Sequence, residues 1–245
     1  MATRRPVISS LAMSEAVHAF FSQWDIYRLC IEHNTLFHRE VGNILHRELQ
    51  EQTGPFTLLD LACGDAELTA AALRGTKVAA YTGVDFSAPA IALAAEKTAT
   101  LACPRRFQEQ DFTHFLRDNK EKFDLIYLGL SLHHLETATK REMMQHLRCA
   151  MADGGSFYLF EPILHAGESR EDYTERWSAA MDGPYDPFPH AARDALREHV
   201  RQSERPEAAE QYLALAHAAG FPRGNILFTD PGNFYSLFRF KARAA

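Results

Sequence analysis

The chain has 245 residues, which suits one α/β domain of ordinary size with an appended helical part. Hydrophobic residues make up 46% of it and charged residues 24%, so a sizeable core can be buried. The formal net charge of −6 argues against a nucleic-acid-binding surface, because neutralising phosphates requires a basic face.

The cysteines and the N-terminus bear on the cellular compartment. Cys30, Cys63, Cys103 and Cys149 are far apart and form no CxxC pair, which favours a reducing compartment over a disulfide framework. The histidines show no metal-ligand spacing, and we expect no metal site. The N-terminus has no apolar signal region, and no stretch approaches the ~20 apolar residues that span a bilayer. We therefore expect a cytoplasmic protein without a membrane partner.

Residues 1–55 are expected to form an N-terminal helical cap. Ser14 can cap a first helix, and an aromatic stripe follows with a period near 3.6 residues: Val17, Phe20, Phe21, Trp24 and Tyr27. Gly54 and Pro55 end the helical pattern. In one interpretation the stripe only packs on the main domain. In the other, part of it, with Tyr27, covers a ligand pocket.

Residues 56–163 alternate between strand and helix patterns. Apolar strands are predicted at 57–61, 79–85, 106–110, 123–130 and 156–160, and helices at 68–73, 89–98, 113–119 and 140–151. Strand, helix and strand in succession imply right-handed crossovers and a parallel sheet. This core is predicted to be Rossmann-like, with helices on both faces.

Two further segments complete the expected α/β fold. Residues 164–218 are rich in charge and proline and are predicted to be a helical insert over a substrate site, with a loop at 182–189. Residues 219–245 contain two short strands, 225–229 and 234–241, around a turn at 230–233. The otherwise parallel sheet is therefore expected to end in an antiparallel hairpin.

The stretch LLDLACGDAELT, residues 58–69, is predicted to hold a ligand. It combines a strand end at Asp60, a turn of small residues that includes Ala62 and Gly64, and the start of a helix. Small side chains let backbone amides approach a ligand closely. Asp60 would repel a pyrophosphate but attract an ammonium group. The single glycine also departs from the G-x-G-x-x-G pattern of NAD sites.

Acidic residues follow the next two predicted strands. Asp85 can accept hydrogen bonds from both hydroxyls of a ribose. Asp111 can accept a hydrogen bond from an adenine amino group, beside the aromatic ring of Phe112. These residues indicate an adenosine-containing ligand without identifying it.

With these motifs, the sequence resembles the class I S-adenosylmethionine-dependent methyltransferases of the small-molecule type. The resemblance rests on LLDLACGDAEL, VDFSAPAI, QDF, FDLIYLGLSLHHL and LRCAMADGGSFYLFEP in this order, and on HAAGF before the hairpin. It implies that S-adenosylmethionine is the cofactor and S-adenosylhomocysteine the product. Ala62 and Ala66 stand where the family usually has glycine.

The resemblance also implies cofactor contacts. Asp60 and Gly64 would hold the methionine end, and Tyr27 would reach its carboxylate. Asp85 would bind the ribose and Asp111 the adenine. The complete expected set is Tyr27, Asp60, Ala62, Gly64, Asp85, Phe86, Asp111, Phe112 and Leu130, in which Phe86 and Phe112 flank the adenine.

His133 and Glu161 are the candidate catalytic residues. Both follow strands that end towards the cofactor, and a His–Glu pair there would orient the imidazole and raise its basicity. Carbon-methylating members of the family use a similar pair. In the alternative interpretation the histidine only packs beside the cofactor.

We therefore expect methyl transfer to an N, O or C nucleophile of a small molecule that the cap and the insert select. Two alternatives stay open: a methyltransferase that modifies tRNA or protein, and a non-catalytic subunit that binds the cofactor. The apolar face of the cap is also compatible with a homodimer.

Overall fold

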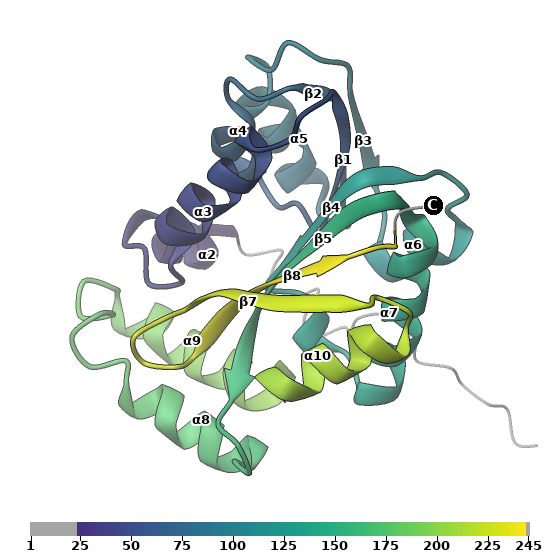
Figure 1. Cartoon of the computed structure of the whole chain (residues 1–245). Coiled ribbons are helices and arrows are strands. Elements are labelled where there is room, and N and C mark those ends of the chain that lie inside the picture. The colour runs from purple at the N-terminus through teal and green to yellow at the C-terminus, as the bar shows by residue number, and fades with distance from the viewer. Residues whose placement is uncertain (1–23, 244–245) are drawn as a thin grey trace, which may run out of the picture.

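The computed structural model describes residues 24–243 (Figure 1). The predicted cap at Ser14 and the stripe residues Val17, Phe20 and Phe21 lie outside the described residues. Within the described part, the predicted α/β fold is confirmed, and the expected division into domains stays a prediction.

A twisted sheet forms the centre of the molecule, with the strand order β3-β2-β1-β4-β5-β8-β7. The strands are β1 (Phe56–Leu61), β2 (Val78–Asp85), β3 (Arg105–Glu109), β4 (Phe123–Gly129), β5 (Met151–Leu164), β7 (Arg223–Thr229) and β8 (Tyr235–Lys241). The first five are parallel. β8 is antiparallel to both β5 and β7, which confirms the C-terminal hairpin. A two-residue strand, β6 (Glu207–Ala208), pairs with the end of β5.

Helices cover both faces of the sheet (Figure 1). One apolar cluster joins one face to α6 (Phe112–Asp118), α7 (Thr137–Ala150) and α10 (Ala209–Ala218). Another joins the opposite face to α3 (His38–Gln50), α4 (Glu67–Leu73) and α5 (Ala88–Lys97). The buried side of α3 recurs with helical spacing at Val41, Leu45 and Leu49, which is why this segment folds as an amphipathic helix.

The cap and the insert pack on each other. Cys30 of α2 (Trp24–Glu32) belongs to a third apolar cluster with Tyr173 and Trp177 of α8 (Arg170–Ala179) and Leu196 of α9 (His190–Ser203). The predicted loop at 182–189 lies between α8 and α9. Figure 1 shows the cap and the insert at the same end of the sheet.

β5 departs most from its predicted bounds. It begins five residues earlier, at Met151 rather than Ser156, so Asp153, Gly154 and Gly155 lie inside the strand. The pairing with β4 passes from Phe123↔Met151 to Leu125↔Ser156, so the extra residues bulge out of the ladder. Gly154 takes φ 74° within this bulge. The glycines therefore interrupt the ladder without ending the strand.

Candidate active site

A cavity of about 1170 Å³ opens where β1, β2 and β4 end beneath the cap. Its wall includes residues of those three strand ends and of α2, α3 and α4. Seven of the nine residues expected to contact the cofactor line it: Tyr27, Asp60, Ala62, Gly64, Asp85, Phe86 and Leu130. Seven of the predicted contacts therefore border one cavity, and their roles towards the cofactor stay predictions.

The turn between β1 and α4 has an unusual backbone. Ala62, Gly64 and Ala66 all have positive φ, at 49°, 54° and 55°. Such a conformation suits glycine and costs an alanine on the order of 1 kcal/mol or more. The small side chains keep the turn open towards the cavity, so the two alanines replace glycine at the expense of local strain.

Asp85 connects β2 with this turn. Its Oδ2 accepts a hydrogen bond from Gly64 N at 2.9 Å, and its Oδ1 accepts one from Ser87 N at 2.8 Å. Both bonds fix the carboxylate at the cavity wall. A carboxylate can accept hydrogen bonds at both of its oxygens, and at each of them more than one.

Asp60 is almost fully buried at the end of β1, with 1% exposure. Its Oδ2 accepts hydrogen bonds from Thr69 Oγ1 at 2.6 Å and Tyr81 Oη at 2.7 Å. Burial raises the pKa of Asp60 to about 7, against the effect of these two bonds. A cation beside Asp60 would favour its charged form, as the ammonium group of a ligand does.

Asp111 and Phe112 lie elsewhere. Neither is among the described residues that line the cavity. Asp111 caps α6, where its Oδ1 accepts hydrogen bonds from Thr113 N at 2.7 Å and Thr113 Oγ1 at 2.6 Å. Phe112 packs in the apolar core under α6. The roles expected of these two residues towards adenine stay predictions.

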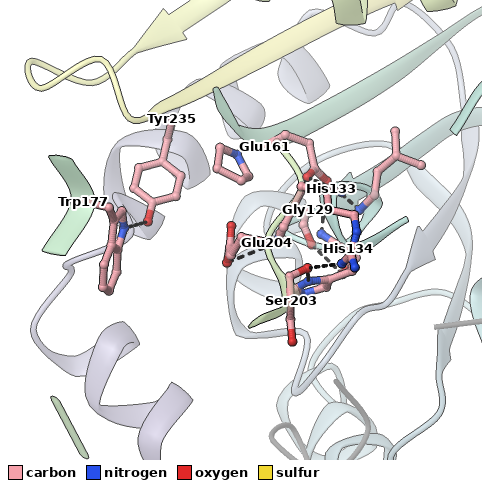
Figure 2. Close-up of polar contacts among 12 residues, drawn as sticks. Gly129, His133, His134, Glu161, Trp177, Ser203, Glu204 and Tyr235 are labelled. Carbon is pink, nitrogen blue, oxygen red and sulfur yellow. Dashed lines mark hydrogen bonds and ion pairs between the residues drawn. The ribbon is translucent and has the colours of Figure 1, made fainter. Parts of the chain in front are cut away.

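His133 and Glu161 are in direct contact, as the sequence predicted. Glu161 Oε2 lies 2.5 Å from His133 Nδ1 and also accepts a hydrogen bond from His133 N at 3.0 Å. Glu161 Oε1 accepts bonds from Ser131 N at 3.1 Å and Leu132 N at 2.9 Å. The carboxylate thereby holds the first turn of the 3₁₀ helix η1 (Leu132–His134) and orients the imidazole (Figure 2).

A second carboxylate faces the other ring nitrogen. Glu204, just after α9, places its Oε1 3.3 Å from His133 Nε2 (Figure 2). Burial by itself lowers the pKa of His133, but Glu204 and Glu161 outweigh that effect and raise it to about 9. The imidazole is therefore protonated at neutral pH while both carboxylates are in place.

A smaller cavity, of about 50 Å³, lies next to His133. Its wall is mostly apolar and aromatic, with Trp177, Tyr185 and Tyr235 among its residues, and His133 and Glu204 supply polar atoms. Trp177 Nε1 donates a hydrogen bond to Tyr235 Oη at 2.9 Å. Tyr27 and Leu130 line both cavities, so the two spaces meet there.

Sequence reasoning did not single out Glu204. It follows a helix rich in charged residues, and that pattern is typical of a solvated face. No local signal distinguishes Glu204 from Glu198 of α9, which is half-exposed. Its contact with His133 depends on how the insert folds back onto the core.

Residues 24–243 contain neither a cluster of metal ligands nor a helix that could span a membrane. No group of three or more His, Cys, Asp or Glu side chains there is arranged to hold a metal ion. Nor does any helix of this part have the length and apolar character needed to cross a membrane.

The family comparison decides the type of domain. Residues 59–157 match the family model described as a methyltransferase domain. This part of the chain is a methyltransferase domain, and the chain has the fold of the class I S-adenosylmethionine-dependent methyltransferases. The matched residues run from β1 into β5, and they include Asp60, Gly64, Asp85 and His133. S-adenosylmethionine, the methyl donor of this class, is the cofactor that the sequence predicted.

Solved structures share the fold of this methyltransferase domain. A possible exported protein from Bordetella parapertussis has a TM-score of 0.61 and 18% identity, and the match covers 84% of this chain and 68% of that one. A putative O-methyltransferase from Nostoc punctiforme has a TM-score of 0.58 and 16% identity, covering 84% of this chain. This chain spans only 56% of the Nostoc chain.

A third structure matches over nearly its whole length. The plantazolicin methyltransferase BpumL, in complex with a monoazolic desmethyl analogue and S-adenosylhomocysteine, has a TM-score of 0.61 and 15% identity. The match covers 92% of this chain and 93% of BpumL. At these identities the likeness establishes the fold alone. No curated protein matches the chain in sequence.

Proposed function

We propose that this methyltransferase transfers the methyl group of S-adenosylmethionine to a hydroxyl oxygen of a small, largely apolar acceptor. The observation that carries the proposal is the position of His133, held by Glu161 and Glu204 beside the smaller cavity. A base is needed when the nucleophile starts protonated, as a hydroxyl group does.

The larger cavity fits the cofactor. The turn of small residues leaves room for backbone approach, Asp85 presents fixed carboxylate oxygens to ribose hydroxyls, and Asp60 would pair with the ammonium group. When bound, S-adenosylmethionine supplies an electrophilic methyl group on its sulfonium. The protein supplies orientation and a cavity from which water is displaced.

The basicity of His133 favours a phenol or enol over an aliphatic alcohol. A phenol has a pKa of about 10, close to the value of about 9 for His133, so proton transfer between them costs little. The pKa of an aliphatic hydroxyl is close to that of water and lies far above that of His133. Only the neutral imidazole can accept the hydroxyl proton, so the imidazolium must first release its Nε2 proton to solvent.

The test follows a labelled methyl group. The protein is incubated with S-adenosylmethionine carrying a ¹³C methyl group and a panel of small phenols, enols, amines and aliphatic alcohols. We expect ¹³C signals of O-methyl groups from phenols or enols. Products methylated only on carbon or nitrogen would contradict the proposal, because the acceptor atom is then a different one.

The same experiment separates the alternative functions. Transfer to tRNA or protein, with none to small molecules, favours a macromolecular acceptor. Tight binding of S-adenosylhomocysteine without transfer to any acceptor favours a non-catalytic subunit. The cytoplasmic location and the homodimer remain predictions from the sequence.

A further inference from the structure

Residues 203–207, which we call the strap, connect α9 to β6 and lie against the chain that follows β4. Arg205 N donates a hydrogen bond to the His133 carbonyl at 3.1 Å. The Ser203 carbonyl lies 3.3 Å from His134 Nδ1. Glu204, whose carboxylate faces His133, therefore belongs to a segment that is hydrogen-bonded to both His133 and His134.

A buried cation holds the other end of the strap. Lys140 of α7 has 0% exposure, and its Nζ lies 2.9 Å from Glu207 Oε1. The same Nζ donates a hydrogen bond to the Arg205 carbonyl. Thr137 Oγ1 donates to Glu207 Oε1 at 2.7 Å. Burial lowers the pKa of Lys140, and the paired Glu207 opposes that effect.

The bonds of the Lys140 ammonium reach both sides of Pro206. They end on the Arg205 carbonyl before it and on the Glu207 carboxylate after it. Proline fixes one backbone torsion, so this part of the strap has little freedom once both ends are bound. Glu204 lies directly before the residues that are fixed in this way.

We propose that Lys140 and Glu207 are positioning residues, whose ion pair holds the strap so that Glu204 stays beside His133. The inference rests on the proposed function, in which His133 is the base. Stability alone is a poor explanation of the pair, because well-packed apolar residues often replace a buried ion pair without loss. Neither residue lines either cavity.

The pKa of His133 shows whether Lys140 and Glu207 position Glu204, and it can be measured without a methyl acceptor. If the strap is released, Glu204 leaves and the pKa of His133 falls, since an adjacent carboxylate moves a pKa by about 1–3. The direct effect of losing the Lys140 cation has the opposite sign, because removing a positive charge stabilises a nearby imidazolium. The Lys140→Met variant therefore separates the two effects by direction.

The experiment is an NMR titration of the full chain labelled with ¹³C at the histidine ring carbons. The His133→Gln spectrum identifies the His133 signal. We expect a midpoint near 9 in the wild type. In Lys140→Met, and in the charge-neutral double variant Lys140→Met/Glu207→Gln, we expect a midpoint lower by about 1 pH unit or more, as in Glu204→Gln.

A matched control uses another partly buried ion pair, Arg239 with Glu48, which joins β8 to α3. The double variant Arg239→Met/Glu48→Gln should leave the His133 midpoint unchanged even if the melting temperature falls. If the Lys140 variants do not fold, Thr137→Val keeps both charges and removes one bond to Glu207. It should lower the midpoint by several tenths of a pH unit.

The inference would be overturned if the His133 midpoint were unchanged or raised in Lys140 variants that fold. If the Lys140 variants do not fold, an unchanged midpoint in Thr137→Val would overturn it. Once an acceptor is known, the double variant should lower kcat while the KM for S-adenosylmethionine stays constant. Failure of the wild type to methylate oxygen would contradict the proposed function instead, and would leave the titration result intact.

Discussion

Glu204 Oε1 lies 3.3 Å from Nε2 of His133, whose other ring nitrogen contacts Glu161. The imidazole of His133 thus lies between two carboxylates from different parts of the chain, one at β5 and one in the insert. His133 and Glu204 also both border the smaller cavity, so the insert supplies a charged group next to the imidazole at that cavity.

The rate of methyl transfer should rise with pH. A general base acts only when unprotonated, so kcat/KM is expected to increase as His133 loses its proton, with a midpoint near 9 in the free enzyme. Replacing Glu204 with Gln removes an anion that favours the imidazolium, and the midpoint should fall by about 1 or more. Stopped assays over pH 6–10 measure this. Glu198→Gln, at a half-exposed position of α9, is the control and should keep the wild-type profile.

Stability should depend on pH through the same residue. The pKa of His133 is about 9 in the folded protein, against about 6.5 when unfolded. His133 therefore contributes up to about 3 kcal/mol to the free energy of unfolding. This contribution is fully present below pH 6.5 and is lost as the pH rises through 9. Urea unfolding of the wild type and of His133→Gln should give a difference in free energy that shrinks over this interval. A constant difference would show that folding does not raise the pKa of His133.

Cofactor binding should depend on Asp85. Its carboxylate holds Gly64 and Ser87 in place and offers oxygens to the ribose, so Asp85→Ala should weaken S-adenosylhomocysteine binding by 100-fold or more, on the order of 3 kcal/mol. Isothermal titration calorimetry measures the affinity. Asp118→Ala, at an exposed position of α6, is the matched control. NAD should not raise the melting temperature of the wild type, and a clear rise would contradict the cofactor assignment.

The strained alanines predict a stabilising substitution. Ala66 has φ 55°, so Ala66→Gly should relieve on the order of 1 kcal/mol of backbone strain. Part of that gain is offset by the greater freedom of glycine in the unfolded chain, leaving a net gain of about 0.5 kcal/mol. Ala71→Gly in the same helix, α4, should instead destabilise by about 1 kcal/mol. Thermal unfolding of both variants compares the signs, and destabilisation by Ala66→Gly would contradict the account.

The residues that border the larger cavity could be predicted to lie together because their signals are local. Asp60 and Asp85 lie at the ends of apolar strands, Gly64 follows one, and parallel strands bring their carboxyl ends to one edge of the sheet. The pairing of His133 with Glu161 followed from the same argument, since β4 and β5 are neighbours. The alternation of strands and helices was sufficient for these contacts.

The remaining contacts depended on tertiary structure. Glu204 reaches His133 only because the strap is bonded to η1 and α7, and no periodicity in the insert indicates that. Asp111 illustrates the opposite problem. An acid that follows a strand is also a good helix cap, and its side chain caps α6 through Thr113. The sequence pattern is the same for both roles.

The central claim is that His133 is the base for methyl transfer to oxygen. The most direct measurement is the single-turnover rate of the wild type and of His133→Gln, with S-adenosylmethionine and an accepted phenol or enol, both saturating. Loss of a general base should slow transfer by 10²–10⁴-fold, while calorimetry shows unchanged affinity for S-adenosylhomocysteine. A His133→Gln variant that transfers the methyl group at the wild-type rate would contradict the claim.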